Sequence, residues 1–365
     1  MHIVIDARRI HSSTGHYIER LIDELQAIDR ENHYTVVVLE EERDHWKPSS
    51  PNFSVQTTTA DHYTFAEQVR FAKLLYKLKP DFVHFSMPQQ PLLWNGRRIT
   101  TVHDTTLVRY ENIDRNKLMY KARKLVFTRL LRNVIKRSDY VITPTHYVKD
   151  DLDEWTDYHY SKKLIVTHES GDMIHAKPEL IKQLSGKQFL FFVGNAFPYK
   201  NLGRIVSAYA ELKYRYPDLQ LVFAGKKEFF YEQLENEVKR RQIPDIAFLG
   251  YISDGQKRWL FQHATAYVCA SLSEGFHIPM IEAMYEQCPV ISSDATCLPE
   301  VGGNATLYFD PTSTDELVAA VTRLMDEPGL RQELIKKGNK NVERFSWKKM
   351  AKETHAVYKK MESKH

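Results

Sequence analysis

Two glutamates eight residues apart, Glu274 and Glu282, lie in the run 273–284, which carries more chemical information than any other part of the chain. Glu274 is followed by Gly275 in an expected loop. Glu282 falls just inside a helix that Pro279 can begin, because proline is tolerated in the first helical turn. A carboxylate accepts paired hydrogen bonds from neighbouring hydroxyl groups. One glutamate on a sugar and one on a ribose would suit a site for a nucleotide sugar.

The elements that must position these residues alternate as short apolar runs and helical patterns. This order is typical of parallel sheets covered by helices. In the first half, strands are expected at residues 3–5, 34–39, 82–85, 99–102 and 140–142, and helices at 17–28, 65–78 and 115–136. The order then restarts, with strands at residues 189–193, 219–224, 246–249, 266–269 and 290–292, and helices at 202–214 and 229–241.

The periodicity lapses between residues 170 and 187, and we place a domain boundary there. The predicted domains are residues 1–175, residues 185–344 and a C-terminal helix at 345–365. Two α/β units that meet at a cleft are the simplest arrangement, and ligands of such sheets bind beyond the carboxyl ends of the strands. We expect the last helix to cross back to the first domain; capping of the second domain is the alternative.

The composition is that of an ordinary globular protein, with 42% hydrophobic and 27% charged residues among 365. A formal charge of +4 is small for this length and does not indicate nucleic-acid binding. The three cysteines lack metal-like spacing and leave one unpaired, so we expect free thiols in a reducing compartment. No stretch approaches about 18 apolar residues and the start has no signal-peptide core, so a cytoplasmic enzyme is expected.

Four runs resemble the blocks of one known family in the expected order: residues 248–254, 273–284, 298–305 and 345–347. Together they resemble the retaining GT-B glycosyltransferases of family 4, and the resemblance covers nearly the whole chain. It implies a GT-B fold, with two Rossmann-like domains facing across a cleft and a C-terminal helix that crosses back to the first domain. It also implies a first domain that binds the acceptor and a second that binds the donor.

By this resemblance Glu274 holds hydroxyls of the donor sugar and Glu282 holds the ribose diol; a plain helix-dipole carboxylate is the alternative for Glu282. A helix N-terminus offers free N–H groups and a positive dipole end to an anion. The backbone expected to meet the sugar and phosphate is that of Gly275, Phe276, His277 and Ile278. His277 stands where the family most often has glycine, and its side chain is expected either to touch the donor sugar or to point out of the cleft.

A second run, residues 193–201, lies between a strand and a helix. Lys200 places a positive charge where a diphosphate leaving group needs neutralising, although a solvated lysine is the alternative. Asn201 suits the N-cap of the helix that follows. The family often has a further arginine near the glycine, where this chain has Asn195. Arg204, one turn into the helix, is a candidate substitute for that missing cation.

The first domain contributes His103 and Asp104, at the end of a strand, which resemble a His-Asp pair of the family that faces the donor sugar. His103 is expected to bond a sugar hydroxyl, and Asp104 to orient it or face the acceptor. A structural histidine bonded to a neighbouring loop is the alternative. Gly15 is similar to the glycine of the family's loop near the donor phosphates and the acceptor. The family's chemistry resembles front-face substitution, in which the leaving phosphate takes the acceptor proton, so no residue is assigned as a base.

Residues 115–137 carry nine Lys or Arg and no Asp or Glu, interleaved with apolar residues. A basic amphipathic helix indicates contact with a membrane surface or with an anionic lipid-linked acceptor. An ordinary helix with its apolar side turned inward is the alternative.

The resemblance leads to a retaining hexosyltransferase that moves a hexose to a saccharide or lipid-linked acceptor in surface polysaccharide synthesis. GDP-mannose is the favoured donor, and UDP-glucose or another UDP-sugar stays open, because base choice depends on backbone contacts near Tyr251 and Ile252. No Asp-x-Asp motif of the kind that metal-dependent transferases carry is recognised, so no bound metal and no cofactor are expected. A non-catalytic nucleotide-sugar-binding protein and an epimerase of the same fold are alternatives. A dinucleotide dehydrogenase fits less well, because neither Gly15 nor Gly194 begins a Gly-x-Gly-x-x-Gly motif.

Overall fold

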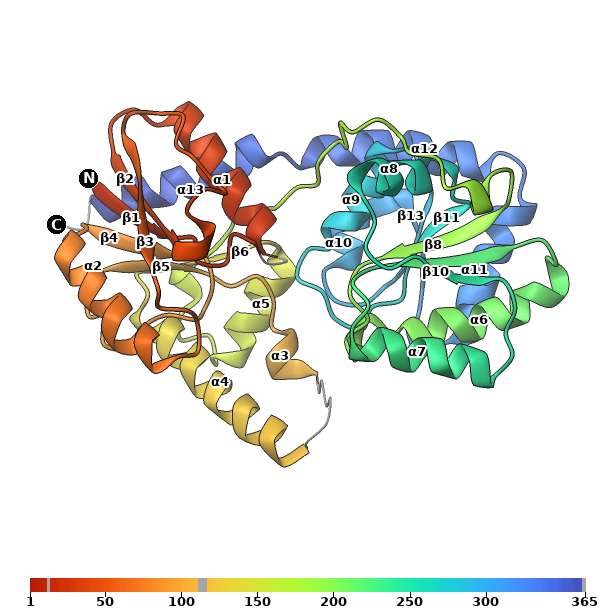
Figure 1. Ribbon diagram of the computed structural model, residues 1–365, viewed down its shortest axis with the longest axis horizontal. Helices are drawn as coiled ribbons and strands as arrows, with labels where there is room; N and C mark the ends of the chain where they lie inside the picture. The colour runs from red at the N-terminus through yellow and green to blue at the C-terminus, as the bar shows by residue number, and fades with distance from the viewer. Residues whose placement is uncertain (12–13, 111–116, 363–365) are drawn as a thin grey trace. The chain divides into compact units, whose positions relative to one another are not determined.

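The chain forms two compact α/β units in the computed structural model, which describes residues 1–11, 14–110 and 117–362 (Figure 1). Of residues 117–120 and 122–123 only the backbone is described. Unit 1 comprises residues 1–105, 122–169 and 346–365, and unit 2 comprises residues 106–121 and 170–345. The division differs from the expected boundary at residues 106–121, which belong to unit 2. Within unit 2, Thr106 Oγ1 lies 3.0 Å from Ser273 Oγ.

Unit 1 is built on a parallel sheet with the strand order β3-β2-β1-β4-β5-β6-β7. Its strands are β1 (His2–Asp6), β2 (His33–Leu39), β3 (Phe53–Thr58), β4 (Phe82–Phe85), β5 (Arg98–Thr101), β6 (Tyr140–Thr143) and β7 (Leu164–Val166). The central strands β1 and β4 are almost wholly buried, as strands covered by helices on both faces must be.

The helices of the first half are α1 (Gly15–Ile28), α2 (Ala72–Leu78), α3 (Thr106–Arg109), α4 (Lys117–Arg137) and α5 (His146–Trp155), with the one-turn helix η1 at Glu40–Glu42. The C-terminal helix α13 (Trp347–Glu362) lies beside α1 (Figure 1). Tyr358 of α13 is completely buried, and its hydroxyl lies 2.6 Å from Nδ1 of His84 on β4. The last helix is therefore part of unit 1, as the sequence predicted.

Unit 2 contains a second parallel sheet, with the strand order β10-β9-β8-β11-β12-β13. Its strands are β8 (Phe189–Val193), β9 (Gln220–Ala224), β10 (Ile246–Phe248), β11 (Ala266–Cys269), β12 (Val290–Ser293) and β13 (Thr306–Phe309). The strand order reverses between β8 and β11, which makes the carboxyl ends of these two strands the switch point of a Rossmann-like sheet.

The helices of unit 2 cover both faces of its sheet (Figure 1). They are α6 (Leu202–Arg215), α7 (Phe229–Arg240), α8 (Asp254–His263), α9 (Ile278–Tyr285), α10 (Leu298–Gly302), α11 (Thr314–Asp326) and α12 (Leu330–Asn341), with the one-turn helix η5 at Pro198–Lys200. Apolar residues of α6, α7 and α11 pack against β8, β9 and β11 to form the main core of this unit. Two Rossmann-like units confirm the predicted fold class.

The strands that the sequence did not predict are β3, β7 and β13, and all three lie at an edge of their sheet. β3 has polar residues at most of its positions and lacks the continuous apolar run that marks a buried strand, whereas β7 and β13 are apolar but only three and four residues long. Among the described helices, none has both the length and the apolar character needed to cross a membrane.

Candidate functional site

The run 273–284 and the run 193–201 meet at the switch point of unit 2. The first follows β11 and leads into α9, and the second follows β8 and leads into α6. Gly194 has φ +148°, a backbone conformation that side chains rarely adopt, so the chain can leave β8 in this direction only with glycine. The sheet topology thus places both predicted runs where ligands of such folds bind.

Lys200 and Glu274 form a buried ion pair, in which Lys200 Nζ lies 2.6 Å from Glu274 Oε1. Only 12% of the lysine side chain and 9% of the glutamate side chain are exposed. Burial works against both charges, but the attraction of the opposite charge lowers the pKa of Glu274 and raises that of Lys200. Glu274 is therefore a carboxylate, and the two predicted site residues are in contact.

The side-chain contacts of Glu274 with the described residues fall on one of its two oxygens. Oε1 accepts a hydrogen bond from Ser271 Oγ at 2.6 Å and lies 3.1 Å from Nδ1 of His277, in addition to Lys200. The main-chain N–H of Glu274 donates to Thr296 Oγ1 at 3.1 Å and fixes the loop. Among the described residues, none forms a hydrogen bond with Oε2, so this oxygen can accept bonds from hydroxyl groups of a ligand.

His277 lies inside the protein beside Glu274 and is 7% exposed, so it does not point out to solvent. Its φ is +77°, in the left-handed region that favours glycine. Glycine is also the residue that the resembled family most often has at this position. Nε2 lies 2.9 Å from the Tyr267 hydroxyl. Burial lowers the pKa of His277, but the charges and hydrogen bonds of Cys269 and Glu274 raise it to about 9. The imidazole is therefore a cation at neutral pH.

Glu282 lies on the second turn of α9, and its Oε1 is 2.9 Å from Nζ of Lys257 on α8. The side chain of Glu282 is 10% exposed. Burial raises the pKa of Tyr267, and the charges of Glu274 and Glu282 raise it further, so both carboxylates act on the same hydroxyl. The two glutamates of the run 273–284 thus lie on either side of the start of α9, Glu274 in the loop before it and Glu282 on its second turn.

The helices α6 and α9 begin without a side chain that caps their N-terminal N–H groups. Asn201 is the N-cap residue of α6, as predicted, but its side chain does not cap the helix: Asn201 has φ +57°, and its amide donates to the carbonyl of Pro311 at 2.9 Å. By contrast, Ser253 caps α8 and Ser313 caps α11. Free N–H groups at a helix start are suited to an anionic ligand.

The other predicted residues of unit 2 are spread more widely. The Asn195 side chain accepts a hydrogen bond from the N–H of Phe197 at 3.3 Å and shapes the loop after β8. Arg204 NH1 donates to Thr314 Oγ1 at 2.7 Å, so its guanidinium is directed to the start of α11, and the structure does not bring it to Glu274. Tyr251 is 87% exposed, and Ile252 beside it is half-buried.

Within the loop before α9, Gly275 and Phe276 are buried, and Ile278 is half-buried. The Phe276 ring packs edge-on against Phe345, with 5.3 Å between ring centroids. This contact anchors the start of α9 to the end of unit 2.

In unit 1, His103 follows β5 and bonds through both ring nitrogens. Nδ1 lies 2.7 Å from Glu169 Oε1, and Nε2 lies 2.9 Å from the carbonyl oxygen of Ser86. Burial lowers the pKa of His103, but the Glu169 carboxylate raises it more, so the net pKa is raised. A carbonyl can only accept, so Nε2 donates to it, while Nδ1 bonds with the Glu169 carboxyl group. The structure shows the bonded histidine that the sequence left as an alternative.

The remaining predicted residues of unit 1 are Asp104, which is exposed, and Gly15, which begins α1. The negative charge of Asp104 also raises the pKa of His103. A Cβ at Gly15 would lie 1.7 Å from the carbonyl oxygen of Ile10, so only glycine allows this close approach.

One group at the site has the donor atoms of a metal site, although Lys200 already neutralises its carboxylate. Cys269 Sγ, an oxygen of Glu274 and a ring nitrogen of His277 lie within 4.8 Å of one another. The Asp-x-Asp sequence of the chain, residues 151–153, lies inside α5 and not at a strand end. No residue of the sequence-predicted donor set belongs to α5.

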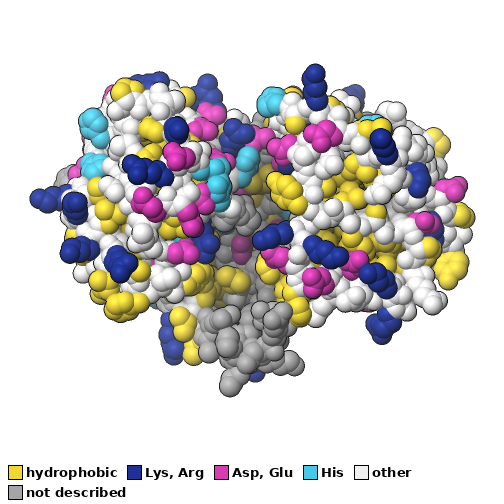
Figure 2. All heavy atoms as spheres, viewed as in Figure 1, with side chains coloured by type: hydrophobic (Ala, Val, Ile, Leu, Met, Phe, Trp, Pro, Cys, Tyr) yellow, Lys and Arg dark blue, Asp and Glu magenta, His cyan; other side chains and the backbone are white. Residues whose placement is uncertain are grey.

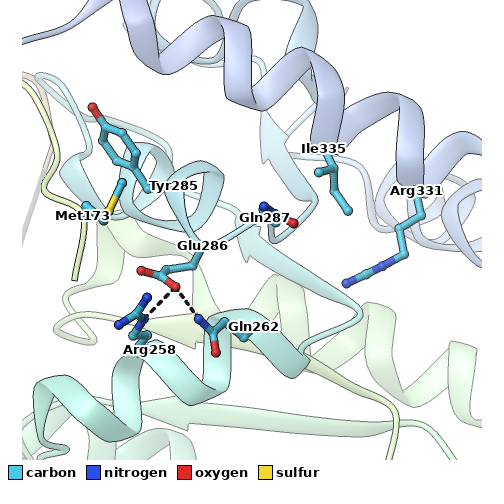
Figure 3. Close-up of a pocket in the computed structure, with 8 residues that line it drawn as sticks. All are labelled: Met173, Arg258, Gln262, Tyr285, Glu286, Gln287, Arg331 and Ile335. Atoms are coloured by element: carbon cyan, nitrogen blue, oxygen red, sulfur yellow. Dashed lines mark hydrogen bonds and ion pairs between the residues drawn. The ribbon is translucent and has the colours of Figure 1, made fainter. Parts of the chain in front are cut away.

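A separate pocket of about 360 Å³ lies at the other end of α9 (Figure 3). Glu286 Oε2 accepts hydrogen bonds there from Arg258 Nε at 3.1 Å and from Gln262 Nε2 at 2.7 Å. None of the predicted site residues lines this pocket.

Sequence reasoning missed the partners that hold the predicted residues: Ser271, Tyr267, Cys269, Lys257 and Glu169. Tyr267 and Cys269 lie on β11 and Ser271 follows it. The carboxyl end of that strand could therefore have indicated these three residues in the sequence. Glu169 is far from His103 in sequence, and no local pattern connects them.

Comparison with known proteins agrees with this geometry. Residues 177–341 match the family model described as Glycosyl transferases group 1, and residues 14–168 match the model described as Glycosyltransferase Family 4. The O-antigen chain mannosyltransferase B of Escherichia coli is 28% identical over 279 residues, which cover 72% of this chain and 70% of that protein.

Solved structures show the same fold. Sucrose-phosphate synthase of Thermosynechococcus elongatus matches over 100% of both chains, with a TM-score of 0.77 and 17% identity. HepE of Anabaena, in complex with UDP and glucose, covers 99% of this chain and 100% of its own, with a TM-score of 0.73 and 14% identity. These matches confirm the GT-B fold, and the two family models together span most of the chain.

Proposed function

We propose that this chain, which belongs to glycosyltransferase family 4, transfers mannose from GDP-mannose to a saccharide or lipid-linked acceptor, with retention of configuration and without a metal ion. The mannose and the polysaccharide context are carried over from the O-antigen chain mannosyltransferase it resembles. The observation that carries the proposal is Glu274, which is held through Oε1 while Oε2 is left for a ligand.

The donor sugar is held by Glu274. A buried carboxylate fixed by Ser271 and His277 cannot turn away, so Oε2 stays in one position to accept bonds from sugar hydroxyls. Its negative charge also stabilises the positive charge that develops at the anomeric carbon as the glycosidic bond to phosphate breaks.

The diphosphate is held by Lys200 and by the N–H groups at the uncapped starts of α6 and α9. Lys200 pairs with Glu274 and precedes α6 by two residues, so we assign its ammonium group the role of bridging the sugar-binding carboxylate and a phosphate oxygen. As the bond breaks, negative charge grows on the leaving phosphate, and the lysine stabilises it more strongly in this low-dielectric position than in water.

His277 supplies a second cation close to this site. The family arginine near Gly194 is absent here, and Arg204 is turned toward α11. The His277 imidazolium lies 3.1 Å from the same carboxylate oxygen as Lys200. Because the His277 imidazolium also pairs with Glu274, the Lys200 ammonium group can bind the diphosphate without leaving a buried carboxylate unpaired.

The ribose is held by Glu282, which Lys257 orients through a hydrogen bond to Oε1. In unit 1, Glu169 and Ser86 hold the His103 ring in place through both of its nitrogens. We assign it the role of orienting the loop after β5 toward the substrates. The leaving phosphate oxygen takes the proton of the acceptor hydroxyl, so no protein base is needed.

The acceptor is proposed to be reached at a membrane surface through α4. The sequence predicted a basic amphipathic helix at residues 115–137, of which residues 115–116 lie outside the described part of the chain. In the described part, Leu125 and Val126 are 51% and 66% exposed, beside the exposed basic residues Arg129 and Arg132. Figure 2 shows hydrophobic side chains among Lys and Arg side chains along the lower edge of unit 1, where Figure 1 places α2 and α4. Apolar and basic groups side by side favour an anionic lipid surface.

The proposal is tested by calorimetric titration with GDP, GDP-mannose, UDP and UDP-glucose, followed by hydrolysis or transfer assays with labelled donor. We expect GDP-mannose to bind most tightly and to be consumed in the presence of EDTA, with an α-linked product by NMR. Tighter binding of UDP-glucose would replace the mannosyl assignment, and binding without turnover would leave only the binding function. Flotation with vesicles that contain anionic lipid, against vesicles of neutral lipid, tests the membrane contact.

A further inference from the structure

Two histidines and two glutamates gather at the carboxyl edge of the unit 1 sheet. His11 lies in the loop after β1, Glu42 ends η1 after β2, His45 follows η1, and Glu19 lies on α1. These four residues come from three segments of unit 1, and none of them belongs to the residues assigned to donor binding.

The two imidazole rings face each other through one nitrogen each. His11 Nε2 is in direct contact with His45 Nδ1. The other nitrogen of each ring contacts a carboxylate: His11 Nδ1 meets Glu42 Oε2, and His45 Nε2 lies 2.5 Å from Glu19 Oε1. A ring nitrogen of each histidine and an oxygen of Glu42 lie within 4.8 Å of one another.

This arrangement has the chemistry of a site for a transition-metal ion. Two facing ring nitrogens can share at most one proton, so at least one of them presents a lone pair to the other. Histidines that bind a metal usually donate their second N–H to a carboxylate, which fixes the ring and its tautomer. Glu19 stands in that position behind His45, and Glu42 stands beside His11.

The donor set also selects the kind of ion. Imidazole nitrogens suit Zn²⁺ and its neighbours, whereas Mg²⁺ and Ca²⁺ prefer oxygen ligands alone. The side chain of His11 is 50% exposed, and those of His45 and Glu19 are about one third exposed, so an ion can enter and keep water in its open positions.

We propose that the facing ring nitrogens of His11 and His45 bind a zinc-class divalent cation, and that Glu42 and Glu19 hold the two rings in the binding orientation from their other nitrogens. The ion would join the loop after β1 to the segment after β2. It would hold the start of α1, where Gly15 lies, in a fixed place. The site depends only on residues of unit 1, and it does not rest on the proposed transferase activity.

The test is calorimetric titration of the untagged chain with Zn²⁺, and separately with Mg²⁺. We expect one equivalent of zinc to bind at this site, no comparable binding of magnesium, and loss of that equivalent in a His11→Gln, His45→Gln double variant. Glu19→Gln should weaken zinc binding about 10- to 100-fold, as loss of an outer carboxylate partner typically does. His33→Gln, which changes an exposed histidine outside the cluster, should bind zinc like the original chain.

Cobalt separates this site from the Cys269, Glu274 and His277 group. Co²⁺ bound to nitrogen and oxygen shows visible absorption without a thiolate charge-transfer band, and we expect that spectrum here. A thiolate band that disappears in Cys269→Ser, or zinc binding that is unchanged in the double variant, would overturn the proposal. Thermal unfolding of each variant without metal confirms that it is folded. If the double variant does not fold, the single His45→Gln variant replaces it in the titration.

Discussion

Two histidine–glutamate pairs, one in each unit, show how similar contacts can serve different ends. His103 and Glu169 in unit 1 lie 2.7 Å apart, and His277 and Glu274 in unit 2 lie 3.1 Å apart. The side chains of both pairs are at most 12% exposed, so burial does not distinguish them. What differs is the rest of the hydrogen-bonding environment.

In unit 1 the histidine is fully engaged, because Ser86 occupies its second nitrogen. In unit 2 the glutamate has two cationic partners on one oxygen, Lys200 and His277, and keeps its other oxygen for a ligand. The histidine of the first pair is therefore fixed in place by two partners. In the second pair, the Glu274 carboxylate can share its cationic partners with a phosphate. The second pair is therefore better suited than the first to binding a donor.

The largest effect should come from Glu274→Gln. The amide keeps the shape but removes the charge that balances Lys200 and His277, so transfer should fall about 1,000-fold, and the free energy of unfolding should fall as well. Labelled-donor assays and urea unfolding measure the two effects. Glu333→Gln changes an exposed glutamate of α12 and serves as the control. Full transfer activity in Glu274→Gln would remove this residue from the site.

Lys200→Met should lower transfer about 100-fold, mainly through kcat, because the charge on the leaving phosphate grows in the transition state. Lys226→Met, at an exposed lysine of the same unit, should leave kcat unchanged. Should Lys200→Met raise only KM, the lysine binds the donor without assisting its departure, and the proposed sharing between Glu274 and the phosphate is wrong.

His277→Gly should change the pH dependence of stability. The folded pKa of His277 is raised to about 9, above the ordinary value of 6.5. Its contribution is therefore fully present below pH 6.5 and is lost as the pH rises through about 9. We expect the original chain to lose up to about 3 kcal/mol of unfolding free energy over this range, and the variant to lose much less.

Urea unfolding at several pH values measures this difference. Glycine suits the φ of +77° at this position, so the variant should fold, and transfer should fall about tenfold and recover partly when imidazole is added. Gln287→Gly places a glycine at φ +58° without removing a cation, which makes it the matched control. Parallel pH curves for the original chain and His277→Gly would show that His277 is neutral.

Glu169→Gln should have the smallest effect, a loss of transfer of about tenfold or less, because it loosens a histidine that positions a loop. It should also lower the pKa of His103, which Glu169 raises. NMR titration of the ring protons measures that pKa directly. An unchanged His103 pKa would mean that the carbonyl of Ser86 alone holds the imidazole.

The sequence predicted much of this site because the relevant signals are local. Glu274, Lys200 and His103 each follow a buried strand, and parallel strands bring their carboxyl ends to one edge of a sheet. The alternation of apolar runs and helical patterns was enough to predict two Rossmann-like units. The domain limits and the role of each site residue stay predictions.

What the sequence could not predict depends on contacts distant along the chain. The tie between His103 and Glu169 spans 66 residues, and that between Lys200 and Glu274 spans 74. Asn201 is at the predicted N-cap of α6, but residue type gave no sign of its left-handed backbone or that its side chain would make no capping hydrogen bond. The edge strand β3 was missed for a related reason: its pattern of burial is set by one neighbour alone.

The position of α13 has a consequence for how the chain is made. Unit 1 is assembled from three stretches of sequence, and the last of them, residues 346–365, leaves the ribosome after all of unit 2. Until then His84 lacks its Tyr358 partner, and the side of α1 that α13 covers is open. Unit 2 is continuous from residue 170 to 345 and can finish folding first, although proteins commonly fold from the N-terminal end during synthesis. A messenger RNA that is truncated near its 3′ end would thus yield a chain with a folded unit 2 and a unit 1 that lacks α13. The uncovered side of α1 would then be accessible to chaperones and proteases.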